Sequence, residues 1–484
     1  MAILDNLEPR SVFNFFEILT NIPRESGNEK AVSDYVVSFA KKRDLEVYQD
    51  QVNNVIIKKQ GTKGYEELPA VIIQGHLDMV CEKNMDTVFN FEKDHIRLTI
   101  KDDYIMADGT TLGADNGIAV AYALALLDSK DIPHPPLEVL LTTDEEVGMK
   151  GALELDTSIL NGKYFINLDS EEEGELLVSC AGGLKAFIHL PIDFQETNNE
   201  KAFNIVIKGL KGGHSGMEID KNRANSNKLL GRILHELSKH IDFDIFTLGG
   251  GLKDNAIPRE AFAKIIIPNN QENKLKKIVL KMEKIFQNEY KTSDAGVKVL
   301  IKGEDSVLQV FSDEVKNKLI FLLFNIPNGV QTMSADIKGL VESSTNLGVI
   351  ERENDYINLI FAVRSSIKSL KYYIRDQIKS FAHFINADFI ETAEYPEWEY
   401  DPDSKLRELF VKTYEERYGE KPLVKALHAG LECGVFSEKI PDLDLISIGP
   451  DMFDVHTPEE NLSISSTKRT WEFLLSVLKN MKNI

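Results

Sequence analysis

The sequence predicts an α/β protein of two domains, with a smaller α+β domain inserted into the first. Three observations support this. The chain has 484 residues, too many for one ordinary hydrophobic core. Short, fully apolar runs in its first part are typical of buried parallel strands that alternate with helices. A middle part with alternating strands and frequent lysines then separates this part from a C-terminal part in the first style.

This change of pattern predicts the domain limits. Residues 1–184 and 395–484 form the first domain, and residues 185–394 form the inserted domain. The order of helices and strands partly repeats within the insert, so we expect two similar halves. Alternating strands indicate an open antiparallel sheet with one face in water.

Hydrophobic periodicity places the individual elements. Spacings of three or four residues between apolar positions predict helices, and short apolar or alternating runs bounded by Gly, Asn or Asp predict strands. Helices are predicted at 11–20, 29–43, 117–127, 222–240, 271–290, 312–324, 369–385, 404–418 and 466–479. Strands are predicted as a pair within 45–58, at 70–73, 102–108, 137–141, 165–168, 203–207, 261–267 and 297–301, as a pair within 346–364, and at 388–393 and 443–448, with a turn at 249–251.

Composition narrows the function. The chain has 56 Lys and Arg against 77 Asp and Glu, a net charge of −21, which argues against nucleic acid or an anionic membrane as partner. Its three cysteines are odd in number and form no CxxC motif, as expected in a reducing compartment. The N-terminus lacks a basic signal-peptide start, and the longest apolar run, 118–127, is too short to span a bilayer. We therefore predict a cytoplasmic protein.

The first candidate metal-binding residues follow the strand at 70–73. His76 and Asp78 come directly after Gly75. Residues two apart on an extended strand end point to the same side, so the imidazole and the carboxylate can converge. A neutral imidazole is a good zinc ligand, and the carboxylate can orient that ring or bind the metal itself.

Acidic residues follow three further apolar elements. Asp115 precedes a helix that is apolar on every side, where a simple N-cap is the alternative reading. Glu145 and Glu146 follow the strand at 137–141, directly after a third acid, and adjacent carboxylates repel one another unless a cation or base is near. Asp169 follows the strand at 165–168.

Because the carboxyl ends of parallel strands meet at one edge of a sheet, we expect these residues to gather there. His456 lies in an equivalent loop near the end of the chain. Two imidazoles and several carboxylates suit two divalent ions, zinc or else manganese or cobalt. A carboxylate left free in such a cluster can serve as general base.

The chain resembles a known superfamily along its whole length. GHLDMV, TTLGADNGIAVA, TTDEEVGMKGA, NLDSEE and FDVHTPEE are similar to the motifs of the dinuclear zinc exopeptidases, which include aminoacylase and carboxypeptidase G. Within that superfamily, ADNG, LHAGLECG and VHTPEE most resemble the Xaa-His dipeptidases, which are carnosinase-like aminoacyl-histidine dipeptidases. The resemblance implies a zinc-exopeptidase-type mixed sheet sandwiched by helices, with the insert as a lid.

The resemblance also implies residue roles. Asp115 would bridge two metal ions, which the resemblance implies to be zinc, and a cis peptide would follow it. The remaining ligands would be His76 and Asp169 on one ion and Glu146 and His456 on the other, with Asp78 orienting His76 and Glu145 acting as general base. The reaction implied is hydrolysis of unblocked dipeptides, including β-alanyl-histidine, by water that the metal activates.

The insert and the loop near residue 430 would contact the substrate. His214 in GGHSG matches the histidine that stabilises the oxyanion, and a surface-loop histidine is the plain alternative. Asn255 and Arg364 match substrate-contacting positions, and Arg364 could hold a C-terminal carboxylate through two hydrogen bonds. Glu432 departs from the Gly-Thr-Asp pattern of many members and could hold a free α-ammonium group. His428 has no assigned role.

Two other readings stay open. A tripeptidase or an N-acyl amino acid deacylase could use the same dinuclear site. A metal-binding scaffold without activity could keep the fold, although the presence of Glu145 beside the full ligand set argues against it. His214 could act within its own chain or from the neighbouring subunit of a homodimer.

Overall fold

The computed structural model describes residues 3–305 and 309–484, which form two compact units. Unit 1 comprises Met1–Ser179, Tyr400–Ala426 and Leu431–Ile484. Unit 2 comprises Cys180–Glu399 and Leu427–Gly430. The limits expected from the sequence lie within about five residues of these, except that the short segment Leu427–Gly430 groups with unit 2.

Unit 1 is built on an eight-stranded mixed sheet in the order β1-β2-β6-β3-β7-β23-β8-β22. The central strands β6, β3, β7 and β23 are parallel, and the outer strands pair antiparallel where their registers are defined. The strands are β1 (Glu46–Gln49), β2 (Val55–Lys59), β3 (Val71–His76), β6 (Leu137–Thr142), β7 (Tyr164–Asn167), β8 (Glu175–Cys180), β22 (Leu423–Leu427) and β23 (Asp444–Ser447). Continuous apolar runs form the centre because both faces of these strands are buried.

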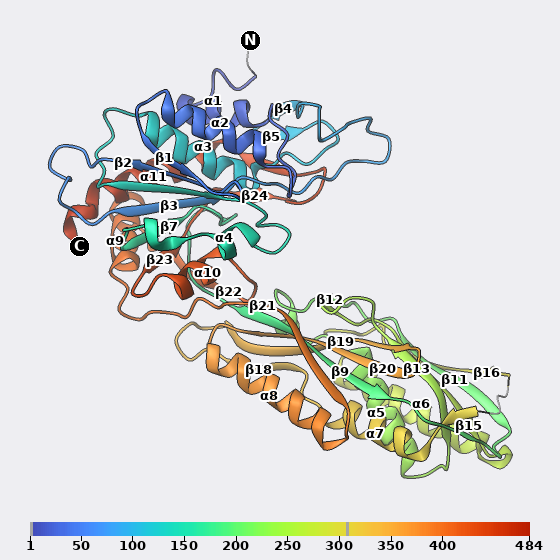
Figure 1. Cartoon of the computed structure of the whole chain (residues 1–484). Helices are drawn as coiled ribbons and strands as arrows, with labels where there is room; N and C mark the ends of the chain where they lie inside the picture. The colour runs from blue at the N-terminus through green and yellow to red at the C-terminus, as the bar shows by residue number, and fades with distance from the viewer. Residues whose placement is uncertain (1–2, 306–308) are drawn as a thin grey trace. The chain divides into compact units, whose positions relative to one another are not determined.

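Helices cover both faces of this sheet, as predicted. Figure 1 shows α1 (Arg10–Leu19), α2 (Lys30–Lys41) and α3 (Ala114–Asp128) on one side and α4 (Lys150–Glu154) and α10 (Glu432–Lys439) on the other. Helix α9 (Lys405–Tyr418) and the closing helix α11 (Ile464–Asn480) pack against each other. Helix α3 is buried from Ala114 to Leu127, and its Tyr122 stacks on Trp471 of α11 with ring centroids 5.6 Å apart.

A small four-stranded sheet completes unit 1. Its order is β24-β25-β5-β4. The strands are β4 (Leu98–Lys101), β5 (Tyr104–Ala107), β24 (Met452–Phe453) and β25 (Asn461–Ser463). The loop between β24 and β25 carries His456, so this sheet anchors that histidine.

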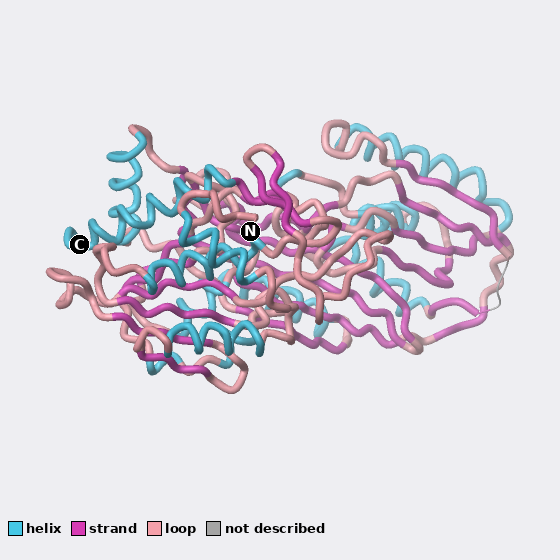
Figure 2. The backbone as a smooth tube through the Cα atoms, turned by 90° about the horizontal axis from the view of Figure 1, so that it is seen from above, coloured by secondary structure: helices cyan, strands magenta, loops and turns pink. Residues whose placement is uncertain are grey.

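Unit 2 carries the inserted α+β fold. Its long strands lie side by side in one antiparallel sheet in the order β16-β11-β15-β13-β19-β20-β9-β21 (Figure 2). They are β9 (Gly182–Pro191), β11 (Lys201–Lys208), β13 (Asp244–Gly250), β15 (Ala261–Ile267), β16 (Lys298–Glu304), β19 (Val341–Glu353), β20 (Tyr356–Ser365) and β21 (Asp388–Tyr395). The helices are α5 (Ser226–Ser238), α6 (Glu272–Glu289), α7 (Asp313–Asn325) and α8 (Lys368–Phe384). Short strands add β10 (Phe194–Glu196), β12 (Gly213–His214), β14 (Ala256–Ile257), β17 (Gln309–Phe311) and β18 (Gly329–Met333).

The topology confirms two similar halves. One half runs β11-α5-β13-β15-α6-β16, and the other runs β9-α7-β19-β20-α8-β21. Their strands have matching spatial orders, β13-β15-β11-β16 and β19-β20-β9-β21. The halves join where β13 pairs with β19, through Gly250 and Ile350. The first half is inserted between β9 and α7 of the second, which explains why the sequence shows only a partial repeat.

The turn predicted at Gly249–Gly251 is wrong for its first two residues. Gly249 and Gly250 belong to β13, where Gly250 pairs with Ala261 of β15. The sequence offered glycines, which usually mark turns, but here tight packing on the neighbouring strand excludes a side chain. Strands β8 and β9 were not predicted either.

Two further observations concern the cysteines and the length of the helices. Within the described part of the chain, Cys81, Cys180 and Cys433 form no disulfide bond. Among the described residues, every helix is too short or too polar to cross a membrane.

The junction of the two halves generates a stability prediction. Gly251 follows β13 at φ +76°, and a Cβ there would overlap the carbonyl oxygen of Gly348. We expect Gly251→Ala to lower the free energy of unfolding by about 1–3 kcal/mol, seen as a lower midpoint in thermal denaturation. Gly303→Ala is the matched control in unit 2, because nothing lies within 4 Å of its added Cβ. Equal midpoints for the two variants would contradict the packing argument.

Candidate metal centre

Residues from distant parts of the sequence meet at one edge of the unit 1 sheet. His76 ends β3, and its pair in the parallel register is Thr142 at the end of β6. Glu146 lies shortly after β6, and Asp169 lies shortly after β7. The carboxyl ends of the three parallel strands therefore deliver these side chains to the same place.

The carboxylate of Asp115 lies between two imidazole rings. Its Oδ1 is 3.2 Å from His76 Nε2, and its Oδ2 is 3.1 Å from His456 Nε2. Each ring has a second carboxylate: Asp169 Oδ1 is 3.3 Å from His76 Nε2, and Glu146 Oε1 is 2.9 Å from His456 Nε2. The Asp115 carboxylate is thus shared by two groups of side chains. His76 and Asp169 lie on the side of one oxygen, and His456 and Glu146 lie on the side of the other.

The backbone around Asp115 departs from a regular helix. The peptide bond between Asp115 and Asn116 is cis, as the resemblance implied. Both residues have non-helical angles, with ψ of 107° and 30°. The Asn116 side chain accepts a hydrogen bond from His76 N–H and donates one to the Leu168 carbonyl. The distorted first turn of α3 is thereby tied to the ends of β3 and β7.

Asp78 connects the end of β3 to the loop after β6. Its Oδ1 is 3.3 Å from His76 Nδ1, although the angle does not make a hydrogen bond. Its two oxygens accept from the backbone N–H groups of Glu145 and Glu146 at 3.1 and 3.2 Å. Ser26 also donates to Asp78. This buried carboxylate lies against the ring of His76 and holds the start of the acidic loop through two backbone N–H groups.

Electrostatics at this centre favour bound cations. Burial raises the pKa of Asp169 to about 7, with the charges of Asp115 and Glu146 adding to the effect. Hydrogen bonds to Asp115 and Glu146 raise the pKa of His456 to about 11. Burial opposes charge on His76, but the carboxylates of Asp169, Asp115 and Asp78 still raise its pKa well above the usual value.

The donor set fits a pair of divalent ions. One ligand atom each from His76, Asp115 and Glu146 lies within 4.8 Å of the others. Imidazole nitrogen and carboxylate oxygen are the ligands that zinc, manganese and cobalt accept. Cations between the rings and carboxylates would replace the protons that otherwise hold this crowded cluster together.

Glu145 and Glu432 are two further acids near these ligands. Burial raises the pKa of Glu145 well above its usual value, and the charges of Asp169 and Glu432 add to the effect. Glu432 is fully buried at the start of α10. Its Oε2 accepts from Gln74 and Thr142, while its Oε1 has no partner among the described residues.

The other predicted substrate contacts gather within unit 2. His214 in β12 pairs with Ala256 of β14, directly after Asn255. A Cβ placed on Gly216 would lie 3.1 Å from the His214 ring and 3.2 Å from Arg364 Nε, which shows how close these groups are. Arg364 Nη1 donates to the Tyr395 hydroxyl at 2.6 Å, while its Nε has no partner among the described residues.

The hydrogen bonds of His214 fix its neutral tautomer. Its Nδ1 accepts from the backbone N–H groups of Gly216 and Met217 at 3.2 and 3.0 Å. The proton of the neutral ring must then be on Nε2. Burial and the charge of Arg364 lower the pKa of His214, so the ring is held as a neutral Nε2–H donor.

His428, which had no role in the sequence analysis, lies beside Gly216, as His214 and Arg364 do. Its Nε2 is 2.7 Å from Ser344 Oγ, and its carbonyl oxygen lies against Gly216. Burial and the charges of Arg364 and His214 lower its pKa to about 3, so the ring is neutral. No spacing in the sequence indicates this contact with Ser344.

Sequence reasoning missed several residues that support the centre. Arg24, Ser26 and Glu29 lie in the loop before α2, which carried no strand or motif signal. Glu29 accepts a hydrogen bond from Asp144 N–H at 3.1 Å. Glu460 lies in the FDVHTPEE motif, where only the histidine was given a role. Apart from its place in that motif, no pattern in the sequence marked Glu460.

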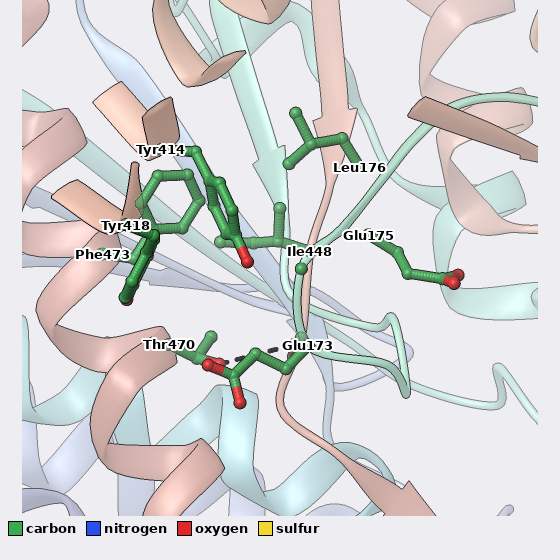
Figure 3. A pocket seen from close by; sticks show the side chains of 10 residues that line it. Glu173, Glu175, Leu176, Tyr414, Tyr418, Ile448, Thr470 and Phe473 are labelled. Atoms are coloured by element: carbon green, nitrogen blue, oxygen red, sulfur yellow. Dashed lines mark hydrogen bonds between the residues drawn. The ribbon is translucent and has the colours of Figure 1, made fainter. Parts of the chain in front are cut away.

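Unit 1 also contains a pocket with a different lining. Its walls include Glu173, the aromatic rings of Tyr414, Tyr418 and Phe473, and the side chains of Leu176, Ile448 and Thr470 (Figure 3). The carboxylate of Glu173 is already held by Arg469 through two hydrogen bonds of 2.7 and 2.6 Å. None of the proposed metal ligands lines this pocket, so we assign it no part in the chemistry.

The chain is similar to known proteins along nearly its whole length. The model of peptidase family M20/M25/M40 matches residues 72–480. The chain is 38% identical over 482 residues to the cytosol non-specific dipeptidase of Escherichia coli K12, covering 99% of each chain. It is 37% identical to the crystal structure of aminoacylhistidine dipeptidase from Vibrio alginolyticus, with a TM-score of 0.94 over 98% of this chain and 97% of that one. The aminopeptidase PepT of Bacillus cereus shares the fold, at 16% identity and a TM-score of 0.58 over 98% and 99%.

The raised pKa values of the two imidazoles generate a prediction about metal binding. Without metal, the neighbouring carboxylates favour the protonated form of both rings, and Asp169, with its pKa raised to about 7, is partly protonated at pH 7. Ligation requires neutral rings and an ionised Asp169, so we expect binding of two Zn²⁺ ions at pH 7 to release about two to three protons. Calorimetric titration in buffers of different ionisation enthalpy measures this number. His456→Ala should release about one proton fewer, and a binding enthalpy independent of the buffer would contradict the prediction.

Proposed function

Because this chain belongs to peptidase family M20/M25/M40, we propose that it is a metal-dependent dipeptidase that hydrolyses unblocked dipeptides, including Xaa-His dipeptides such as β-alanyl-histidine. The observation that carries the proposal is the carboxylate of Asp115, which contacts His76 with one oxygen and His456 with the other. This arrangement suits two ions that share one ligand. The names of the two full-length relatives support a dipeptidase.

We assign the ligands by the two sides of Asp115. His76 and Asp169 would hold one ion, and His456 and Glu146 would hold the other. The ions, when bound, would polarise the scissile carbonyl and make the attacking water more acidic. Asp78 keeps the His76 ring and the backbone of the acidic loop in place through its contacts with both.

Glu145 is the proposed general base. Its backbone N–H is fixed by Asp78, while its side chain forms no hydrogen bond in the described part of the chain. Burial and neighbouring carboxylates raise its pKa towards the range in which a base can take a proton and return it. Glu145 would accept a proton from the attacking water and deliver it to the leaving amine.

His214 is the proposed donor to the developing oxyanion. The support is its tautomer: backbone N–H groups occupy Nδ1, so the neutral ring can donate only from Nε2. A neutral donor aimed at a developing negative charge lowers the barrier without giving up its own proton.

Specificity for unblocked dipeptides would come from two side chains that each have one buried polar atom without a partner among the described residues. The unpartnered Nε of Arg364 could donate to the C-terminal carboxylate of the substrate, with Asn255 nearby as a further contact. The unpartnered Oε1 of Glu432 could accept from a free α-ammonium group. An N-acylated substrate would leave Glu432 without that partner. A tripeptidase or N-acyl amino acid deacylase with the same centre is the alternative.

The cytoplasmic location stays part of this proposal. It rests on the composition and on the word cytosol in the name of the Escherichia coli relative. Recovery of the native protein in a membrane or secreted fraction after cell fractionation would contradict it.

The roles of the adjacent acids can be separated by substitution. We expect Glu145→Ala to retain both ions and to lose activity by about two to four orders of magnitude, because only the proton transfer is removed. Glu146→Ala is the matched control and should lose one ion. Elemental analysis after dialysis, together with steady-state turnover, gives both quantities. Loss of an ion from Glu145→Ala, with both kept in Glu146→Ala, would exchange the two roles.

Substitution of His214 tests the oxyanion role. We expect His214→Ala to lower kcat by about two to three orders of magnitude with unchanged metal content, since one donor to the transition state is lost. His235→Ala is the control, because His235 stacks on Phe324 in the same unit and has no proposed catalytic role. Near-normal kcat in His214→Ala would remove the role. Activity regained by mixing His214→Ala with Glu145→Ala would show delivery from a neighbouring subunit.

A panel of substrates tests the function itself. After metal reconstitution, we expect hydrolysis of unblocked dipeptides, including those ending in histidine, and little hydrolysis of tripeptides or N-acetyl amino acids. Glu432→Gln should weaken the preference for a free amine, because an ammonium group would lose its charged partner. Initial rates of amine release compare all substrates directly. Faster hydrolysis of N-acetyl amino acids than of free dipeptides would favour the deacylase.

A further inference from the structure

A buried glutamate holds the loop that carries Asp115. Glu460 is only 2% exposed, and its carboxylate accepts hydrogen bonds from four consecutive backbone N–H groups. Oε2 accepts from Leu112 and Gly113 at 2.7 and 2.9 Å. Oε1 accepts from Ala114 at 2.7 Å and from Asp115 itself at 3.4 Å. Both oxygens are therefore occupied by donors, which suits the ionised form of the side chain.

A buried arginine holds the same loop through its carbonyl groups. Arg24 is also 2% exposed. Its guanidinium donates to the Gly113 carbonyl, and it donates to the carbonyl groups of Leu77 and Asp78 at 3.1 and 2.9 Å. Arg24 thus links the loop before α3 to the end of β3, immediately after His76.

Gly113 makes this double contact feasible. It has φ +72°, a region that favours glycine, and a Cβ there would collide with the Arg24 guanidinium and the Met79 sulfur. With no side chain in the way, its N–H reaches Glu460 while its carbonyl reaches Arg24. A single peptide segment is therefore held from both ends of the chain, by residues outside the proposed ligand set.

We propose that Glu460 is a positioning residue for the metal centre, which fixes the backbone of residues 112–115 so that the Asp115 carboxylate stays between the two imidazoles. Arg24 completes this restraint from the β3 side. The opposite charges of Glu460 and Arg24 offset each other in a buried region where either alone would be costly. The proposal rests on the assignment of Asp115 as a metal ligand.

Ordinary helix capping makes a different prediction. A carboxylate near the N-terminus of α3 could stabilise the fold alone, because helix ends leave N–H groups unpaired. That effect would appear equally in the metal-free and metal-loaded protein. A positioning role requires in addition that metal affinity fall when the carboxylate is changed, since residues that orient ligands typically contribute about 10- to 100-fold to affinity.

Two substitutions at Glu460 separate charge from shape. Glu460→Gln keeps the side-chain size but turns an NH₂ group towards backbone donors, so two of the four N–H groups lose their acceptor. Glu460→Asp is shorter but keeps both acceptor oxygens. We expect Zn²⁺ affinity, measured by competition with a chromophoric chelator, to fall about 10- to 100-fold in Glu460→Gln and less in Glu460→Asp. Glu459→Gln is the control, because its side chain is exposed one position earlier.

Cobalt substitution adds a readout of geometry, and Glu460→Gln should alter the visible absorption spectrum of bound Co²⁺.

If Glu460→Gln does not fold, Arg24→Lys tests the same restraint, and at least a tenfold loss of affinity is expected. Wild-type affinity in Glu460→Gln, with only a lower melting temperature of the metal-free protein, would overturn the proposal in favour of capping. Greater loss in Glu460→Asp than in Glu460→Gln would also overturn it. Absence of metal binding by the wild-type protein would instead reject the proposed function, and the positioning role with it.

Discussion

The structure of the centre depends on one constraint: several carboxylates and two imidazoles are held at contact distance in a buried place. Asp115 lies at the middle, within 3.2 Å of His76 and 3.1 Å of His456. Like charges at such distances repel, so the arrangement needs cations or protons to persist. Parallel strands bring the side chains together, and Asp78 and Glu460 hold the connecting loops through backbone N–H groups.

Much of this arrangement could be predicted because its signals are local. A buried strand that ends in a polar residue is visible in a few adjacent positions, as in the run that ends at His76 or the one before Glu145. The parallel register then brings such ends together without further information. The alternation of strands in the insert likewise indicated its separate fold, and the two halves of unit 2 confirm the repeat. The substrate and the identity of the metal are not local properties, so they remain proposals.

The features that could not be predicted depend on residues far apart in the sequence. Glu460 is about 345 positions in sequence from the N–H groups that donate hydrogen bonds to it. Arg24 is 89 positions from Gly113, whose carbonyl it contacts. Hydrophobic periodicity says nothing about a single charged residue in a loop, so the sequence does not distinguish a buried charge from an exposed one. Strand β9 was missed because its partners, β20 and β21, come much later in the chain. The turn predicted at Gly249 and Gly250 was wrong because close packing between strands favours glycine as much as a turn does.

The central claim is that Asp115 is shared by two metal ions. Anomalous diffraction at the zinc absorption edge, from crystals of the reconstituted protein, tests this most directly. The account predicts two peaks about 3.5–4 Å apart, with the Asp115 carboxylate between them, His76 and Asp169 beside one and His456 and Glu146 beside the other. A single peak, or two peaks of which only one lies within ligand distance of Asp115, would contradict the account.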